Sequence, residues 1–298
     1  MRLNDWGKFW LLGLLWGSSF LWIKIGLRGT GPFMLVALRL AVGVVGLGIV
    51  VFMRKPNFSA TPSLVGKLVL LGAFNTAIPF LLITWGEKSI DSALASILNG
   101  TMPLFTILLS HFFLADERIT VPKFLGLIVG FGGVVLLLGG GSEKEELRGS
   151  FVGQMAVLIA AFSYASSLVF TRRTLRQVSP LIQAFVPLVM ADAFVWMLIP
   201  VAESPIRFPT NAEAWFAILW LGLLGTFVAY ILYFSLLQSV GPTKTALVTY
   251  VIPVMGLILG VIFLEERIDL RLALGSILIF AGIAVVNWEP RKSRIPSS

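Results

Sequence analysis

The sequence lacks cysteine altogether and contains a single histidine, His111. Disulfides, thiol nucleophiles and metal sites built from cysteine or clustered histidine are therefore excluded. The chain also lacks a Gly-x-x-x-x-Gly-Lys phosphate loop and a Gly-x-Ser-x-Gly nucleophile motif, so nothing in it supports direct use of ATP or hydrolytic chemistry. We expect a protein that is not an enzyme and that requires no cofactor and no metal.

Charged residues are scarce as well, at 13% of the chain, whereas about 25% is usual in soluble proteins. Hydrophobic residues make up 57%, so most of the surface is expected to face lipid. A net charge of +8 indicates nucleic-acid binding only where the basic residues share one face. Here they are scattered through short connections, which indicates charges that orient membrane spans, and we expect no nucleic-acid partner.

The hydrophobic residues gather in runs that are long enough to cross a bilayer, which takes about 20 residues in a helix. Helices are expected because backbone polar groups in lipid must be satisfied within the segment. The first run closes with Lys24 and Arg28 and has no cleavage site, so we interpret it as a span and not as a signal peptide. The sequence therefore predicts an all-α polytopic membrane protein with ten transmembrane helices, at 9–27, 33–52, 64–85, 93–114, 121–139, 151–170, 180–201, 214–237, 243–264 and 270–288.

The connections between these segments carry an uneven distribution of positive charge. With a cytoplasmic N-terminus, the inner side holds fourteen Lys and Arg residues and the outer side eight. An excess of basic residues marks the cytoplasmic side of a membrane protein. We expect a multi-pass protein of a bacterial inner (plasma) membrane with both termini cytoplasmic.

The two halves of the sequence resemble each other. Glu-Arg-Ile occurs at 117–119 and again at 266–268, and glycines follow at the same spacings, so that the offset is 149 throughout. Pro103 matches Pro253 at an offset of 150. Because each half holds five spans, an odd number, the second half must enter the membrane from the opposite side. The result is an inverted repeat, a common plan of secondary transporters, whose solute site lies near the midplane between the halves.

This repeat sets the expected organisation of the chain. Residues 1–140 form the first five-helix repeat, 141–150 a linker, 151–290 the second repeat and 291–298 a basic cytoplasmic tail.

A family resemblance rests on Trp16-Gly17-Ser18-Ser19, on Arg39 in the second span, on the prolines of spans four and nine, and on the two Glu-Arg connections that lead into glycine-rich spans. In these features, residues 8–288 resemble the drug/metabolite transporter superfamily with its EamA-type repeats. The resemblance implies a ten-helix carrier that exports amino acids, metabolites or drugs; some members carry nucleotide sugars. The overall pattern is similar to aromatic amino-acid exporters of the YddG type.

Small hydroxyl residues and deep aromatic residues are the candidates for contacting a solute. Small residues leave room for a ligand, and an apolar pocket with a few polar groups is the usual form of a small-molecule site. Close helix packing through small residues remains an equally open interpretation for the serines. The predicted binding residues are Trp16, Ser18, Ser19, Thr76, Phe80, Asn99, Tyr164, Ser167, Tyr230 and Tyr250.

Four residues are predicted to act in gating or as hinges: Gly17, Pro79, Pro103 and Pro253. Proline removes a hydrogen bond inside a helix and kinks it. Prolines are also tolerated in membrane helices without a special role, so a plain kink stays open as the alternative.

Two charged residues lie inside predicted spans, Arg39 in the second and Asp192 in the seventh. Charge in lipid is costly and calls for a reason. A solute clamp or a proton-coupling pair is one interpretation; helix–helix bonding or contact with a water-filled cavity is the other. Mid-span carboxylates are otherwise absent from the sequence, which weighs against tight proton coupling and against a strongly cationic solute.

Together these features predict a secondary transporter that exports small organic solutes, aromatic or neutral amino acids or related metabolites, by alternating access. A multidrug exporter of amphipathic compounds, an intramembrane lipid-modifying enzyme and a structural subunit are the alternatives. The expected partners are the solute and membrane lipid, with proton coupling left open, and the expected state is a monomer or weak oligomer.

Overall fold

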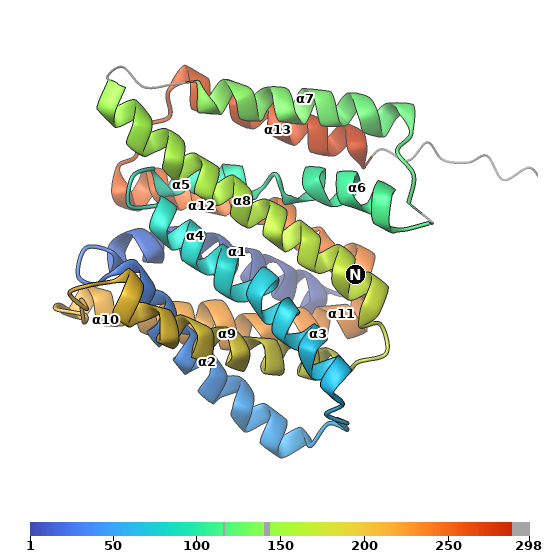
Figure 1. Ribbon diagram of the computed structural model, residues 1–298. Coiled ribbons are helices and arrows are strands. Elements are labelled where there is room, and N and C mark those ends of the chain that lie inside the picture. The colour runs from blue at the N-terminus through green and yellow to red at the C-terminus, as the bar shows by residue number, and fades with distance from the viewer. Residues whose placement is uncertain (116, 140–143, 288–298) are drawn as a thin grey trace, which may run out of the picture.

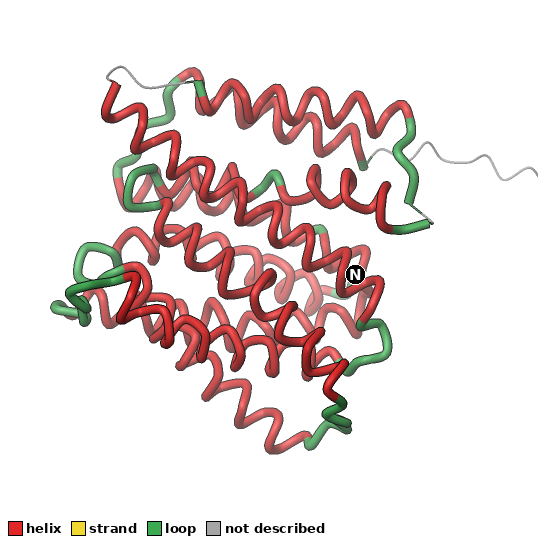
Figure 2. The backbone as a smooth tube through the Cα atoms, viewed as in Figure 1, coloured by secondary structure: helices red, strands yellow, loops and turns green. Residues whose placement is uncertain are grey.

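The computed structural model describes residues 1–115, 117–139 and 144–287, and within them every regular element is a helix (Figure 2). The first half contains α1 (Leu3–Gly26), α2 (Pro32–Arg54), α3 (Pro62–Gly72), the π-helical η1 (Ala73–Ala77), α4 (Ile78–Gly86), α5 (Ser92–Asn99), α6 (Met102–Phe113) and α7 (Val121–Leu138). The second half contains α8 (Lys144–Thr174), α9 (Pro180–Ala202), α10 (Ala212–Leu219), the π-helical η2 (Trp220–Val228), α11 (Ala229–Ala246), α12 (Val248–Leu264) and α13 (Leu270–Val286).

These elements confirm the ten-span, all-α fold. In the described part of the chain, nine helical segments are long and apolar enough to cross a membrane, and the shorter α13 coincides with the tenth expected span. Its expected last residue, 288, lies outside the described residues, as does the tail 291–298.

Several spans are less regular than their hydrophobic runs suggest. The third span consists of α3, η1 and α4, and the eighth likewise contains a π-helical stretch, η2, at the corresponding place in the second half. The fourth span is broken between α5 and α6 at Gly100 and Thr101. The eighth ends at Gly241, whose φ of 81° lies in the left-handed region that glycine adopts without strain.

One helix begins earlier than expected. The apolar span Ser150–Thr174 agrees with the sixth span expected from residue 151, but its helix, α8, begins at Lys144, within the expected linker 141–150, whose residues 141–143 lie outside the described part of the chain. The stretch Lys-Glu-Glu-Leu-Arg that opens α8 consists of good helix formers.

The two halves are related by an approximate two-fold exchange. In Figure 1, α1 runs away from the marked N-terminus, and α8, which begins the second half, runs in the opposite direction. α1 packs against α12 and the η2 region, whereas α8 packs against α5, α6 and α4, the corresponding elements of the other half. In each half, the first helix therefore packs mainly against helices of the other half.

The same two-fold relation is found in the glycine contacts between α7 and α13. These two helices pack against each other and form a separate layer in Figure 1. A Cβ atom added to Gly126 would lie 2.7 Å from the Gly282 carbonyl oxygen, and one added to Gly133 would lie 2.7 Å from that of Gly275. Gly126 and Gly275 are equivalent at the offset of 149, as are Gly133 and Gly282. The contacts are therefore reciprocal, as a two-fold relation requires, and small residues permit this close packing in lipid.

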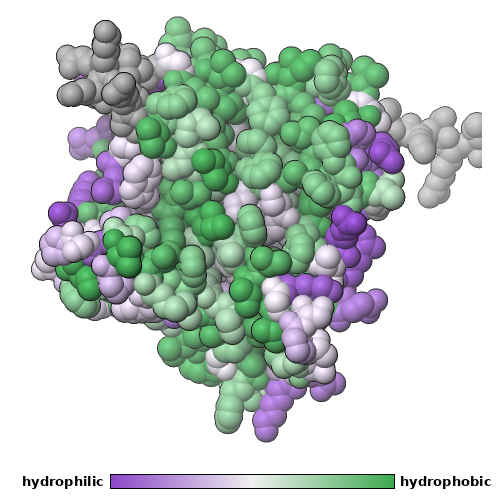
Figure 3. All heavy atoms as spheres, in the orientation of Figure 1, coloured by the Kyte–Doolittle hydropathy of each residue, from purple (hydrophilic) through white to green (hydrophobic). Residues whose placement is uncertain are grey.

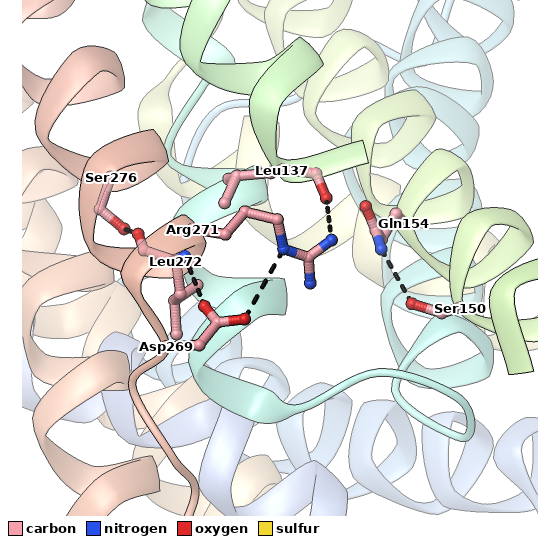
Figure 4. Close-up of polar contacts among 7 residues, drawn as sticks. All are labelled: Leu137, Ser150, Gln154, Asp269, Arg271, Leu272 and Ser276. Atoms are coloured by element: carbon pink, nitrogen blue, oxygen red, sulfur yellow. Dashed lines mark hydrogen bonds and ion pairs between the residues drawn. The ribbon is translucent and has the colours of Figure 1, made fainter. Parts of the chain in front are cut away.

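The polar connection between α12 and α13 secures the end of this helix pair (Figure 4). Asp269 accepts a hydrogen bond from the Leu272 amide at 2.6 Å and so caps α13, and its other carboxylate oxygen lies 3.7 Å from Arg271 Nε. Arg271 donates to the Leu137 carbonyl at 3.0 Å, in the last turn of α7. A cation at this helix end offsets the negative end of the dipole.

The surface matches a protein surrounded by lipid. Figure 3 shows a broad hydrophobic face, with hydrophilic side chains gathered mainly toward the two ends of the molecule where the connections lie. On α2, for example, Val45, Ile49 and Phe52 are exposed. Buried leucines such as Leu40 of α2 and Leu188 of α9 pack between the helices instead.

Candidate functional site

A cavity of about 440 Å³ lies between the two halves. Its walls come from α1–α6, α8, α9, α11 and α12, together with η1 and η2. The volume falls in the range of small-molecule pockets, about 300–1,000 Å³. Its position between inverted repeats is the one expected for a solute site.

Eight of the residues singled out from the sequence line this cavity, and they come from both halves. They are Trp16, Ser19, Arg39, Phe80, Asn99, Tyr164, Ser167 and Tyr230.

Three other predicted binding residues do not line the cavity. Ser18 is adjacent to the lining residue Ser19 but is buried. Its hydroxyl accepts a hydrogen bond from Trp220 Nε1 at 3.0 Å and donates one to the Leu15 carbonyl. Thr76 is also buried, beside Tyr230. Tyr250 packs instead against the hydrophobic core formed around α5 and α13. Their places fit the alternative interpretation, helix packing, better than direct contact with a ligand.

Arg39 is the one charged side chain among the residues that line the cavity, and it is 5% exposed. Its Nε donates to Thr226 Oγ1 at 3.3 Å, and its guanidinium carbon lies 4.1 Å from the centre of the Phe80 ring. A cation over an aromatic face is stabilised by the ring electrons. Among the described residues, no carboxylate lies within 4.0 Å of Arg39, so the outer nitrogens of its guanidinium remain available to a ligand.

Asp192 was predicted as a possible coupling partner of Arg39, but the structure does not bring the two together. Asp192 is half-buried on α9 beside Trp196 and is not a lining residue. The cavity consequently holds a positive charge with no acidic residue in its described walls.

The two matched prolines lie near the cavity without lining it. Pro103 begins α6 after the break in the fourth span, and Pro253 lies inside α12. The residues four positions earlier, Asn99 and Thr249, both line the cavity. Proline leaves the carbonyl at that position without its helical partner. A Cβ atom on Gly100 would lie 3.0 Å from Pro253 Cγ, so the two irregular segments also contact each other.

The remaining hinge candidates occupy packed positions. A Cβ atom on Gly17 would lie 2.5 Å from Met255 Cβ and 2.9 Å from the Ile252 carbonyl oxygen, so α1 and α12 meet there too closely for any larger residue. Pro79 is in the first turn of α4, directly after η1. Because the span continues from η1 into α4, proline removes one hydrogen bond from it at this position.

Sequence reasoning missed several polar lining residues, of which Asn75, Gln183 and Thr226 are the most notable. Asn75 Oδ1 accepts a hydrogen bond from Ser167 Oγ at 2.9 Å, which ties η1 to α8. The repeat contained a signal for one of them, because the offset of 150 that aligns the prolines also aligns Thr76 with Thr226. Both threonines fall in the π-helical segments.

At one end of the molecule no described residue of the connections lines the cavity, and carboxylates there bridge the two halves. This closed end carries the connections 27–31, 87–91, 203–211 and 265–269, on the left in Figure 1. Glu203 accepts hydrogen bonds from the amides of Phe33 at 2.8 Å and Met34 at 3.3 Å, at the start of α2. Carboxylates at helix N-termini are favourable because of the helix dipole.

Glu266 makes a similar contact with the start of α5, where its two carboxylate oxygens accept hydrogen bonds from the amides of Ser92 and Ala93, each at 2.8 Å. At the opposite end, the one with the N-terminus, the cavity reaches helix ends: Pro180 and Gln183 of α9 and Thr245 and Ala246 of α11 line it there. The structure thus has one end at which hydrogen bonds join the two halves, and a cavity that extends toward the opposite end.

Comparisons with known proteins agree with this architecture. The EamA-like transporter family matches twice, over residues 6–139 and 151–288. "Uncharacterized transporter YoaV" of Bacillus subtilis (strain 168) is 26% identical over 279 residues, which cover 91% of this chain and 92% of that protein. "Uncharacterized inner membrane transporter YedA" of Escherichia coli (strain K12) is 26% identical, with 94% and 89% covered.

A further relative, "Probable amino-acid metabolite efflux pump" of Escherichia coli (strain K12), is 25% identical over 292 residues and 92% of each chain. One solved crystal structure has a TM-score of 0.67 and 23% identity, with 96% of this chain and 97% of that chain covered. At that identity, the structure supports the shared fold alone.

Proposed function

The chain belongs to the EamA-like transporter family and is a multi-span membrane transporter, and from its cavity we propose that it exports small organic solutes that carry a carboxylate, above all aromatic or neutral amino acids and related metabolites. The observation that carries this proposal is Arg39, a buried and unpaired cation in an otherwise aromatic and neutral cavity. The relatives described as inner membrane transporters support a bacterial inner membrane as its location.

The chemistry of the cavity favours an anionic group over a cationic one. A guanidinium donates two parallel hydrogen bonds to a carboxylate, a stronger and more specific contact than a point charge gives. Rings of Trp16, Tyr164 and Tyr230 offer faces on which an aromatic solute can stack. Because no acidic residue lines the described walls, a strongly cationic drug would meet the Arg39 charge without compensation.

The same lining residues argue against the catalytic alternative. Hydrolysis or group transfer requires a nucleophile with a base in hydrogen-bond reach. Among the described lining residues there is no histidine, aspartate or glutamate. An intramembrane enzyme would therefore have no histidine or carboxylate at this cavity to act as a general base.

Transport would proceed by alternation between two conformations, each of which is closed at a different end of the molecule. In the present state, Glu203 and Glu266 hold the closed end by bonds from the second half to the first. Because the halves are related by a two-fold exchange, breaking these bonds and closing the opposite end gives a second state of similar packing. The solute bound at Arg39 would be exposed to each side in turn.

Flux into proteoliposomes that contain only this protein tests the proposal. We expect phenylalanine and phenylpyruvate to be transported and to compete with each other, whereas phenethylamine, which lacks the carboxylate, should compete at least tenfold more weakly, since a buried charge-assisted bond is worth about 1.5–3 kcal/mol. Arg39→Gln should abolish the distinction, and Arg39→Lys should restore it in part. Equal competition by the amine and the acid in the wild type would refute carboxylate recognition.

A further inference from the structure

A second buried ionisable side chain lies near the cavity, at the closed end. The Glu87 side chain is completely buried, and neither of its carboxyl oxygens has a hydrogen-bond partner among the described residues. Glu87 follows the last turn of α4, and its amide donates to the carbonyl of Ile83, a cavity-lining residue, at 2.9 Å. Glu87 is thus one helical turn beyond a residue that lines the cavity.

The neighbouring charged groups are held by other partners. Lys24 of α1 donates to the backbone carbonyls of Glu87 and Ile90, both at 2.7 Å, so that it binds the connection and not the carboxylate. Glu266, in the connection after α12, is engaged by the α5 amides. Arg39 of α2 interacts with Glu87 electrostatically, without a hydrogen bond or an ion pair. Asp91, on the same connection as Glu87, is exposed.

On the remaining side, α8 packs closely against the end of α4. Where α8 packs against Gly86, the contacts come from Gly153, Ala156 and Val157. Among the residues whose side chains the structure describes, Glu87 therefore has no counter-ion in contact.

A carboxylate in this position is costly, because an unpaired buried charge loses its hydration without compensation. Burial raises the pKa of the Glu87 carboxyl well above its usual range; the negative charge of Glu266 adds to the rise, and Lys24 and Arg39 oppose it. The closed end therefore favours a neutral, protonated Glu87.

We propose that Glu87 is a proton-binding site coupled to closure of this end of the carrier: closing the end binds a proton, and opening it hydrates the carboxyl group and releases the proton. The proposal rests on the alternating access of the proposed function, but not on the identity of the solute. In the transport cycle, each closure of this end, loaded or empty, would take up a proton from the solution on that side.

The sign of the pH dependence follows from linkage. The pKa of Glu87 is raised in the closed state and close to its ordinary value, about 4.3, when the end is open and hydrated. Below the ordinary value protonation favours neither state further, and the closed state is at its most stable. As the pH rises toward the raised pKa, the ratio of closed to open falls by up to about tenfold per pH unit.

The test measures the conformational equilibrium without any solute. Because the chain has no cysteine, spin labels can be placed at Lys88→Cys and Glu213→Cys, two exposed positions on opposite halves at the closed end. We expect the distance distribution to shift from short to long as the pH is raised from about 5 to about 9, a range that brackets a raised glutamate pKa. With Glu87→Gln, the short distance should persist at every pH.

Asp91→Asn is the matched control, since it removes an exposed carboxyl four residues away and should respond to pH like the wild type. An unchanged pH response in Glu87→Gln, or none in the wild type, would overturn the proposal. If the glutamine variant does not fold, infrared spectroscopy of the wild type and of Glu87→Asp decides, because the band of a protonated Glu87 carboxyl should be present in the wild type and should change in frequency in Glu87→Asp. Absence of a neutral carboxyl band at neutral pH would also overturn the proposal, whatever the flux experiments show.

Discussion

At the scale of single residues, two tryptophans of one helix have very different roles. Trp16 and Trp10 both belong to α1, yet Trp16 lines the cavity and contacts Tyr233 with a ring separation of 5.8 Å, whereas Trp10 is 50% exposed on the surface. Both are apolar side chains in an apolar run. Only their direction around the helix separates a wall of the cavity from a contact with lipid.

This difference gives a paired test of the cavity. Trp16→Ala removes a ring from the cavity wall, and we expect it to lower the solute affinity by roughly tenfold, since aromatic contacts contribute about 0.5–1.5 kcal/mol beyond area burial. Trp10→Ala should leave affinity within twofold of the wild type. Initial rates of phenylalanine flux over a concentration series would measure both. Equal losses at equal folded yield would place the solute elsewhere.

At the scale of helices, the contact between α7 and α13 depends on glycine at particular positions. A Cβ atom on Gly133 would lie within 2.9 Å of the Ile279 amide nitrogen, whereas one on the adjacent Gly132 would meet nothing within 4 Å. Backbone atoms cannot move aside as a flexible side chain can. The offset of 149 identifies Gly133 and Gly282 as equivalent, but not which face of each helix meets the other.

Substituting the two adjacent glycines should therefore have opposite consequences. Gly133→Ala should destabilise the protein by about 1–3 kcal/mol through overpacking. Gly132→Ala should be neutral or slightly stabilising, because alanine has the higher helix propensity. Thermal unfolding in detergent, followed by circular dichroism, would compare the two. A loss of stability in Gly132→Ala as large as in Gly133→Ala would contradict the packing seen here.

At the scale of the whole molecule, hydrophobic runs and the internal repeat were sufficient to predict the ten spans, because lipid leaves the backbone no alternative to helices. Cavity residues were harder to predict, since side chains that face lipid, core and cavity are all apolar. Tyr250, a predicted binding residue, packs against the core. Gln183, which no pattern in the sequence identifies as a binding residue, lines the cavity. Glu87 escaped attention because its position at a helix end suggests a solvated carboxylate, and only the surrounding packing reveals its burial.

The orientation of the molecule in the membrane decides the direction in which the present cavity faces. Both the N-terminus and the end of α13 lie on the side opposite the closed end (Figure 1), and the excess of Lys and Arg in the connections on their side indicates the cytoplasm. If so, the described conformation is closed to the outside, and its cavity extends toward the cytoplasm, where an exporter must collect its solute.

Single cysteines in the cysteine-free chain test this orientation directly. Lys88→Cys and Glu213→Cys lie at the closed end, and Ser59→Cys lies in the connection between α2 and α3; all three positions are exposed. A membrane-impermeant maleimide added to intact cells should label the first two, and should label Ser59→Cys only after the membrane is permeabilised. The reverse pattern would place both termini outside. The closed end would then face the cytoplasm, Glu87 would exchange its proton with that side, and the cavity would be poised to collect solute from outside, as an importer requires.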